Sequence, residues 1–216
     1  MAGDLVSFTL LSLSSILIIV NPLGATLIYV SLTNGMDRAG QDVVARDACR
    51  FALLILLFVA IAGTWVLQFF GITLEAFRIA GGILLFGIGM EMVYARTSRT
   101  KMTQTEQDES RDADDVAVMP IALPMIAGPG AITTTIVLMN EATGMTLAAY
   151  AIVLFSIIFS IGITYYMMRH SEYIMKKIGQ RQYRAINRLM GMLLIAIAVQ
   201  FVITGIRMAF PTLGGG

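Results

Sequence analysis

Two short helix-breaking segments interrupt long apolar runs, and they carry the binding chemistry that this sequence offers. They are Asn21–Gly24 (Asn-Pro-Leu-Gly) and Ala127–Gly130 (Ala-Gly-Pro-Gly). Proline cannot donate a backbone hydrogen bond, and glycine weakens the helix around it. In lipid such a break persists only where protein or a wet cavity satisfies the freed backbone groups. Two breaks in corresponding positions of two halves therefore predict a site near the middle of a membrane.

The first break has the residues of a helix start. Asparagine is a good N-cap, and proline suits the first helical position, so a half-helix should begin at Pro22. That start predicts free backbone N–H groups at Gly24 and Ala25. Gly128 and Pro129 can restart the other helix similarly and present the N–H groups of the next three residues, which are Gly130, Ala131 and Ile132.

Two such helix starts would favour a small zwitterion. Each N-terminus carries roughly half a positive charge and attracts an anion, so a carboxylate could bind without an arginine. Carbonyls freed at the preceding half-helices could receive an ammonium group, and the small residues leave room only for a small side chain. Hydroxyls of Thr134 and Thr135 could also bond the ligand. The predicted substrate-binding residues are Asn21, Pro22, Gly24, Ala25, Thr26, Gly128, Pro129, Gly130, Ala131 and Thr133. The alternative is that both breaks are proline kinks for close helix packing.

The bulk composition indicates a membrane protein. The chain has 216 residues, of which 57% are hydrophobic and 13% charged, and its mean hydropathy is +0.79. Soluble domains are about 45–50% apolar and about 25% charged. We therefore expect an all-α membrane protein that forms one transmembrane bundle over residues 1–216. The first apolar run lacks a preceding basic region, so we expect it to be retained rather than cleaved.

The apolar runs predict six transmembrane helices, of which the first and fourth are broken. Their ranges are Leu5–Leu32, Ala48–Phe70, Ile72–Tyr94, Val116–Asn140, Leu147–Met168 and Leu189–Phe210. All but two of the 15 basic residues, Arg78 and Arg207, lie in or beside the connections after the first, third and fifth runs. Basic loops stay in the cytoplasm, so both termini should lie outside it.

The two halves of the chain predict an inverted repeat. Around the breaks, a shift of 107 positions gives four identical residues: Ile19, Pro22, Thr26 and Val30 match Ile126, Pro129, Thr133 and Val137. In the third and sixth runs, a shift of 109 gives five more: Gly82, Leu84, Leu85, Ile88 and Val93 match Gly191, Leu193, Leu194, Ile197 and Val202. Three spans per half is an odd number, so the second half must enter the membrane from the opposite side. We assign repeat 1 to about residues 1–96, a cytoplasmic linker to about 97–115 and repeat 2 to about 116–216.

The break motifs also resemble a known family. Asn21–Gly24, then Phe77–Gly82 (Phe-Arg-Ile-Ala-Gly-Gly), then Pro124–Ile132 closely resemble the MarC family of bacterial and archaeal membrane proteins, over nearly the whole chain. The resemblance implies six spans. It also implies a link to a branch of the family that transports small neutral amino acids such as glycine and alanine.

Two charged residues inside predicted spans are further candidates. Glu91 lies about one turn from the cytoplasmic end of the third span and could carry a coupling proton, or it could be a solvated charge at the interface. Arg78 lies near the outer end of that span. We expect Arg78 to be an anchor that extends to the membrane surface, with a gate as the alternative.

These features favour a secondary transporter of small neutral amino acids in the cell (inner) membrane that works by alternating access. The coupling ion could be a proton or sodium, and the other partners are the substrate and the lipid bilayer. We expect no enzymatic activity, cofactor, metal or nucleic-acid partner, since His170 is the only histidine and Cys49 the only cysteine. Alternatives are an exporter of another small metabolite and a non-transporting assembly or signalling protein. The oligomeric state, the substrate and the direction of transport are left open.

Overall fold

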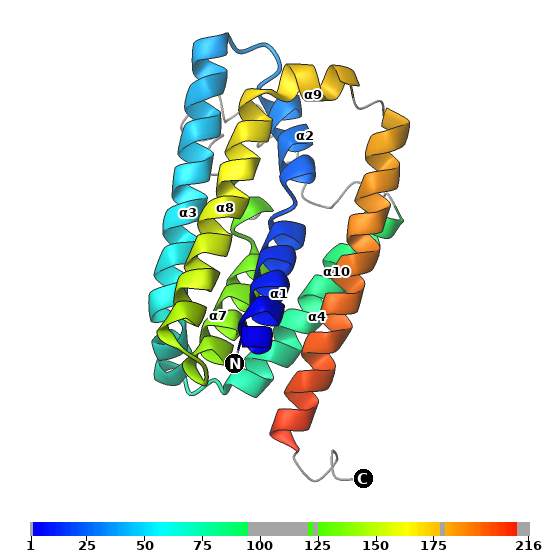
Figure 1. Cartoon of the computed structure of the whole chain (residues 1–216). Helices are drawn as coiled ribbons and strands as arrows, with labels where there is room; N and C mark the ends of the chain where they lie inside the picture. The colour runs from blue at the N-terminus through cyan, green and yellow to red at the C-terminus, as the bar shows by residue number, and fades with distance from the viewer. Residues whose placement is uncertain (1, 95–120, 123–124, 178–179, 211–216) are drawn as a thin grey trace.

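The computed structural model describes residues 2–94, 121–122, 125–177 and 180–210, and the described residues form helices and turns without a strand (Figure 1). The predicted linker at 97–115 lies outside them. Residues 121–122 and 125–126 form wide, π-type turns. The α-helices are α1 (Ala2–Val20), α2 (Pro22–Leu32), α3 (Arg38–Phe69), α4 (Leu74–Val93), α7 (Pro129–Thr143), α8 (Leu147–Arg169), α9 (Ser171–Lys177) and α10 (Gln180–Ala209).

Five of the six predicted spans correspond to described helices that are long and apolar enough to cross a membrane. They are Leu5–Leu32 (α1 with α2), Arg38–Phe69, Leu74–Val93, Leu147–Arg169 and Arg184–Ala209. The predicted fourth span, 116–140, is described only from residue 121 onward and with a gap at 123–124. Its α-helical part, α7, has 15 residues. The break predicted in the first span is confirmed at Asn21.

Side-chain caps set the starts of α3 and α4. The Asp37 side chain accepts a hydrogen bond from the backbone N–H of Gly40 at 2.9 Å, so α3 begins at Arg38 rather than at the predicted Ala48. Thr73 caps α4 through the N–H of Ala76 at 3.2 Å. Such caps satisfy N–H groups that lack a partner within the helix. The added turns of α3 are polar, which is why the apolar pattern did not include them.

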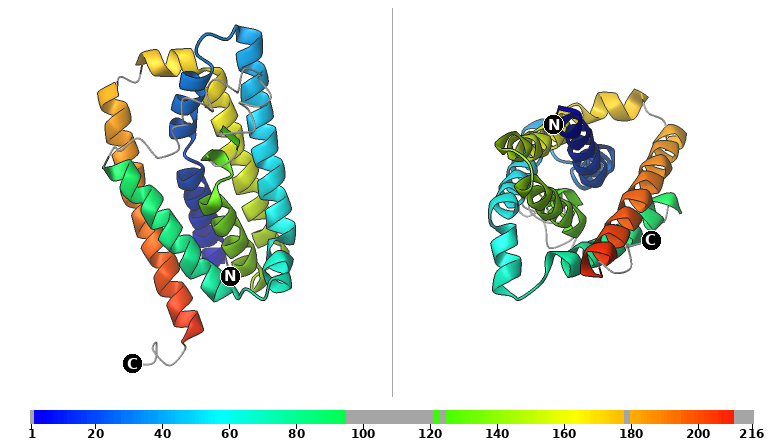
Figure 2. Two further views of the ribbon diagram at one scale, coloured as in Figure 1. Left: turned by 180° about the vertical axis from the view of Figure 1, so that it is seen from behind. Right: turned by 60° about the horizontal axis from the view of Figure 1, so that its bottom comes forward.

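The helices form two packed groups, which we call the body and the arm. The body contains α1, α2, α3, α7, α8, residues 121–122 and residues 125–127, and one core of buried side chains runs through it. The arm is the pair α4 and α10, which pack along each other beside the body (Figures 1 and 2). The start of α1 and the end of α10 lie at the same end of the bundle, which we call the α1 end. The short helix α9 lies across the opposite end, the α9 end (Figure 1).

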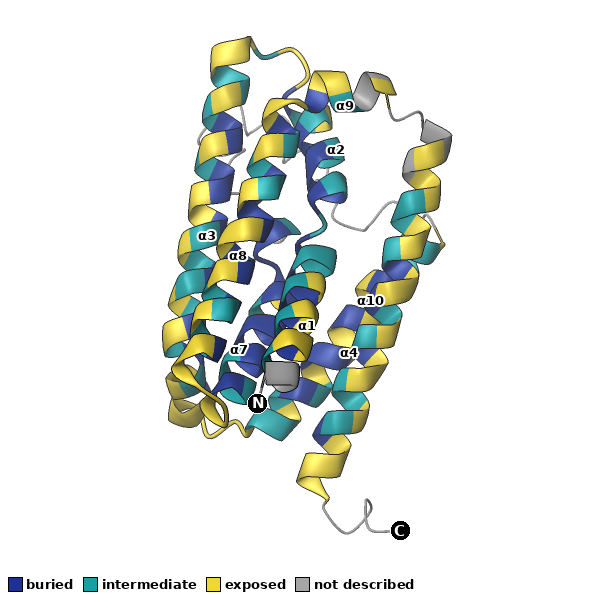
Figure 3. Ribbon diagram, viewed as in Figure 1, coloured by how far each residue is buried: buried dark blue, intermediate teal, exposed yellow. Residues whose placement is uncertain are grey.

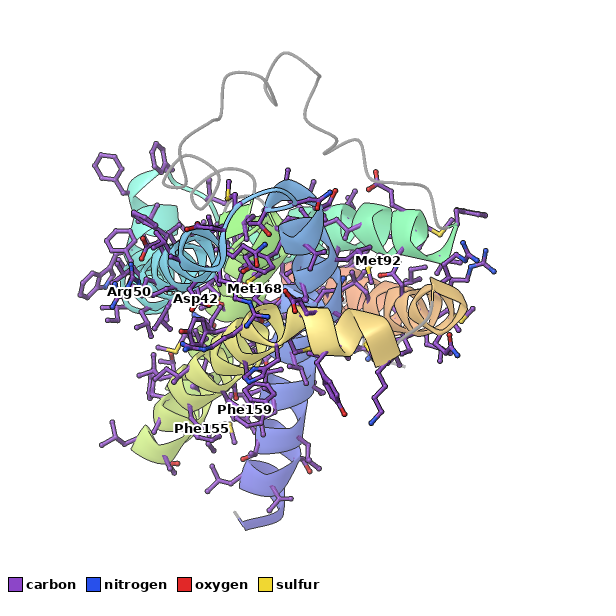
Figure 4. The ribbon with its side chains drawn as sticks, turned by 90° about the horizontal axis from the view of Figure 1, so that it is seen from above. Asp42, Arg50, Met92, Phe155, Phe159 and Met168 are labelled. Carbon is purple, nitrogen blue, oxygen red and sulfur yellow. The ribbon has the colours of Figure 1, made fainter. Side chains whose placement is uncertain are left out.

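Large apolar side chains lie on the outside of the bundle as well as inside it. Buried faces turn toward one another, while much of the outer surface of α3, α8 and α10 is exposed (Figure 3). Phe58 and Trp65 are 64% and 69% exposed on α3. Phe155 and Phe159 stack with ring centroids 5.8 Å apart on the outer side of α8, whereas Met168 is buried (Figure 4). An exposed apolar surface of this extent fits lipid rather than water.

Small residues bring the two arm helices close together. A β-carbon added to Gly82 would lie 2.8 Å from the backbone oxygen of Ala198, and one added to Gly89 would lie 3.0 Å from that of Gly191. Beyond them, a β-carbon on Gly205 would lie 3.1 Å from the Glu75 carbonyl oxygen. Membrane helices commonly associate through such small residues, since lipid provides no hydrophobic drive between helices.

We expect Gly82→Val to separate α4 from α10. The new side chain would meet backbone, which cannot move aside as a flexible side chain can. Overpacking of this kind typically costs about 1–3 kcal/mol of stability. Thermal unfolding of the purified protein in detergent measures the loss. Gly87→Val is the matched control, because a β-carbon at Gly87 on the same helix meets nothing within 4 Å. Equal melting temperatures for the two variants would contradict the close contact.

Candidate functional site at the two helix breaks

The first break is one left-handed residue. Asn21 has φ 48° and ψ 67°, and it is the only non-glycine residue with positive φ in the described part of the chain. Asparagine tolerates this conformation better than most residues. Its N–H still donates to the carbonyl of Leu17 at 3.1 Å, so α1 closes normally before the chain turns. Pro22 then occupies the first position of α2, where its missing N–H is not needed.

The start of α2 is satisfied by its own chain, which corrects one prediction. The Oδ1 atom of Asn21 accepts from the N–H of Gly24 at 3.2 Å, and the Asn21 carbonyl accepts from the N–H of Ala25 at 3.0 Å. The predicted free N–H groups of Gly24 and Ala25 are therefore in use. The cap itself was predicted correctly. The error arose because the sequence does not show that the cap occupies the same donors that we assigned to a ligand.

The second break is different because no side chain caps it. Gly128 precedes α7 with φ −72° and ψ 175°, and it has no side chain that could accept a hydrogen bond. Pro129 follows at the first position, and Ile132 donates to the Gly128 carbonyl at 3.0 Å. Of the three predicted N–H groups, that of Ile132 is thus in use. The N–H groups of Gly130 and Ala131 belong to the helix start that receives no side-chain cap.

The two breaks lie next to each other. A β-carbon added to Gly130 would lie 3.5 Å from Cγ2 of Ile19, two residues before Asn21, and 2.5 Å from Cδ2 of Leu85 on α4. From this level α2 runs toward the α9 end and α7 runs toward the α1 end (Figure 1). Their N-termini therefore approach each other from opposite halves of the bundle. Asn21 is half-buried and Pro129 is exposed, so each break keeps a side that the described chain does not cover.

Threonine hydroxyls near the breaks fall into two groups. The hydroxyl of Thr26 donates to the Pro22 carbonyl at 2.7 Å, and that of Thr133 donates to the Pro129 carbonyl at 2.9 Å. Both close the first turn of their helix. The next residues on α7 differ, because the hydroxyls of Thr134 and Thr135 are fully buried and have no hydrogen-bond partner among the described residues. Ser12 and Ser160 share that property, and apolar periodicity gave no signal for them.

Gly24 and Gly130 have packing roles in addition to any contact with a ligand. A β-carbon at Gly24 would overlap the side-chain amide of Asn21, so glycine is needed for the cap. At Gly130 it would meet the end of the Leu85 side chain. Valine at either position would disturb packing as well as block access to the backbone. Loss of binding in such variants would therefore not identify the ligand site by itself.

The Phe77–Gly82 motif connects α4 to both of its neighbours. A β-carbon on Gly81 would overlap Thr133 of α7, whereas one on Gly82 would meet α10. Two adjacent glycines are needed because they face different helices.

Arg78 is 3% exposed, and its Nη2 donates to Oε1 of Glu141 on α7 at 2.8 Å. The expected surface anchor is thus wrong, because Glu141 draws the guanidinium inward to form an ion pair. Glu141 was not among the predicted site residues.

Other candidate groups lie away from the breaks. Glu91 is half-buried near the C-terminal end of α4, about four turns from Arg78 along the helix. No cluster of three or more His, Cys, Asp or Glu side chains that could hold a metal ion occurs in the described ranges. The candidate site at the two breaks is built from helix ends, small residues and hydroxyls.

Comparisons with known proteins match this description. Residues 6–210 match the model of a family described as MarC family integral membrane proteins. A UPF0056 membrane protein of Methanocaldococcus jannaschii is 40% identical over 200 residues, which are 93% of this chain and 96% of that protein. The UPF0056 membrane protein YvbG of Bacillus subtilis is 33% identical over 92% of this chain and 94% of its own length. No solved structure gives a significant match.

The fold and site define an all-helical, multi-pass integral membrane protein whose first span is broken near its middle. Within that class, this chain belongs to the MarC family. The resemblance found in the three sequence motifs is therefore confirmed.

A substitution series at Asn21 separates the two features of the first break. Asn21→Gly keeps the backbone free to adopt positive φ but loses the cap, at a cost of a few tenths of a kcal/mol. Asn21→Ala loses the cap and adds left-handed strain, which together cost roughly 2–3 kcal/mol. We expect thermal unfolding in detergent to rank wild type above Gly and Gly above Ala. An Ala variant as stable as the Gly variant would show that positive φ is not required.

Proposed function

We propose that this protein is a secondary transporter of small neutral amino acids, of the glycine and alanine type, that works by alternating access in the cell membrane. The observation that carries the proposal is the meeting of two interrupted helices in the interior of a membrane bundle. Lipid-exposed irregular backbone is not found in membranes, so the uncovered side of each break favours a water-filled cavity. This proposal assigns the chain no catalytic activity.

The ligand that suits these breaks is a small zwitterion. The uncapped start of α7, at Gly130 and Ala131, offers backbone donors and about half a positive charge for a carboxylate. The carbonyls that end α1, before Asn21, offer acceptors for an ammonium group. Ile19 and Leu85 lie close to the backbone of Gly130 and leave little space for a ligand there. This favours an amino acid whose side chain is a hydrogen or a methyl group.

The arm supports an inverted repeat, which alternating access commonly uses. The sequence shift of 109 equates Gly82 with Gly191 and Gly89 with Ala198. Gly82 packs against Ala198, and the counterpart contact, between Gly191 and Gly89, is also present. An axis that exchanges the two halves would pass through the middle of this contact. We propose that the halves form two inverted repeats of three spans, with residues 116–140 supplying the fourth span.

The charges support placing the α9 end in the cytoplasm, with both termini outside. Arg38, Arg46 and Arg50 lie in the first turns of α3, and Arg38 forms an exposed ion pair with Glu172 of α9 at 3.1 Å. Basic residues near span ends favour the cytoplasmic side. A cysteine at Ala2 that reacts with an impermeant reagent only after cells are opened would reverse this orientation.

Uptake into proteoliposomes tests the function. We expect the purified wild-type protein to accumulate labelled glycine or alanine when a proton or sodium gradient is imposed. If Glu91 carries the coupling proton, Glu91→Gln should abolish accumulation against a gradient and leave exchange of internal for external substrate largely intact. Gradient-driven uptake by Glu91→Gln at the wild-type rate would exclude Glu91 from coupling. Absence of both binding and uptake in the wild type would refute amino-acid transport.

The buried hydroxyls provide a test of the site. If Thr134 bonds the ligand, Thr134→Val should weaken glycine binding roughly five- to tenfold, since a hydrogen bond contributes about 1 kcal/mol. Its thermal stability should be unchanged or higher, because the variant removes a buried hydroxyl that has no partner in the described part of the chain. Thr164→Val is the matched control, as Thr164 is also fully buried but donates to the Ser160 carbonyl at 2.8 Å. Equal affinities in the two variants would exclude Thr134 from the site.

A further inference from the structure

Arg78 and Glu141 form an ion pair between the arm and the body that helix packing alone does not require. The Arg78 side chain is 3% exposed and that of Glu141 is 36% exposed. One guanidinium nitrogen, Nη2, donates to Glu141, whereas the buried Nε has no partner among the described residues. A buried charge with an unused donor is costly, so its presence at this interface calls for an explanation.

The pair lies at one end of a line of contacts that starts at the breaks. Along the α4–α7 interface, Gly130 meets Leu85, then Thr133 meets Gly81, and then Glu141 meets Arg78. The three contacts follow the two helices in antiparallel order, from mid-bundle toward the α1 end. A solute that moved along this interface from the breaks to the α1 end would meet the ion pair last.

We propose that the Arg78–Glu141 ion pair is a gate that closes the path from the two helix breaks to the α1 end of the bundle. This inference rests on the proposed transport function. Arg78 belongs to α4, which packs closely against α10 through glycines, while Glu141 belongs to α7 of the body. Separation of arm and body at this end breaks the pair, and their return re-forms it.

The chemistry of the pair suits reversible opening. Glu141 is partly exposed, so water reaches one side of the carboxylate while the closed pair keeps Arg78 dry. On opening, water can bond every donor of Arg78, including the Nε that has no partner among the described residues in the closed state. A carboxylate on the passing solute can take the place of Glu141, because it offers the same acceptor geometry to the guanidinium.

The gate belongs to one end of the molecule only. Under the proposed repeat, the shifts of 109 and 107 equate Arg78 with Asn187 and Glu141 with Asn34. Both counterparts are neutral, and Asn187 instead donates to the Met92 carbonyl at 3.4 Å within the arm. The conformation described here is therefore held by an ion pair at the α1 end, with neutral side chains at the equivalent positions near the α9 end.

Thiol accessibility tests the gate directly. In a Cys49→Ala background, a reporter cysteine replaces Val137, which is buried on α7 one turn from both Thr133 and Glu141. The protein is reconstituted in lipid nanodiscs, and the rate of reaction with a charged, water-soluble thiol reagent is measured. Glu141→Gln should raise this rate about tenfold, because the open state becomes more populated. The double variant Arg78→Gln with Glu141→Gln, which leaves no buried charge unpaired, should do the same.

Two further variants make the outcome decisive. The charge exchange Arg78→Glu with Glu141→Arg should return the rate toward that of the reporter protein, since it rebuilds the pair. Glu172→Gln is the control, because it neutralises the exposed pair with Arg38 at the other end and should leave the rate unchanged. Unchanged rates in both Glu141→Gln and the double neutral variant would overturn the gate. Glycine binding is measured on the same proteins, so a wild type that binds no amino acid refutes the transport proposal separately from the gate.

Discussion

The constraint on which this structure depends is that backbone groups inside a membrane have no water to bond. Every N–H and C=O that a helix break releases must find another partner or face a wet cavity. At Asn21 the chain meets this requirement for two N–H groups within a few residues, through bonds from Gly24 and Ala25, and Pro22 has no N–H to satisfy. The carbonyls at the end of α1, in the middle of this 28-residue apolar span, are the groups of this break that remain available to a ligand or to water.

The two breaks meet the constraint in different ways, so the two helix starts of the candidate site are not equivalent. The side chain of Asn21 uses a donor of α2, so little of that helix start is left for a ligand. Gly128 has no side chain, so the corresponding donors of α7 at Gly130 and Ala131 receive no cap. If a carboxylate binds here, the helix dipole and the uncapped backbone N–H donors both favour the start of α7. The matched proline motifs had suggested two equivalent helix ends, and only the asparagine of the first distinguishes them.

The sequence predicted those parts of the structure that depend on local chemistry. Apolar run length predicted five of the spans that are described, and the Asn-Pro pair predicted both the break and the cap. The start of α3 was missed because hydropathy records the charges of its first turns and not the cap at Asp37. The ion pair of Arg78 was missed for a different reason, since Glu141 lies 63 residues away and becomes a neighbour only through packing of α4 on α7. The hydroxyls of Thr134 and Thr135, which have no partner among the described residues, likewise depend on which neighbours surround them.

Adjacent glycines explain how one helix can belong to the arm and still reach the body. Gly82 allows α4 to pack against the backbone of α10, while Gly81, on the neighbouring face, leaves room for Thr133 of α7. In the contact with α10, glycines bring backbone against backbone beside the buried side chains of Leu85 and Leu194, so α4 and α10 are expected to move together. The contact with α7 is made of a threonine, a leucine and an ion pair, whose side chains can change rotamer. A relative movement of arm and body would therefore be easiest along α4 and α7, which is the interface that joins the two helix breaks to Arg78.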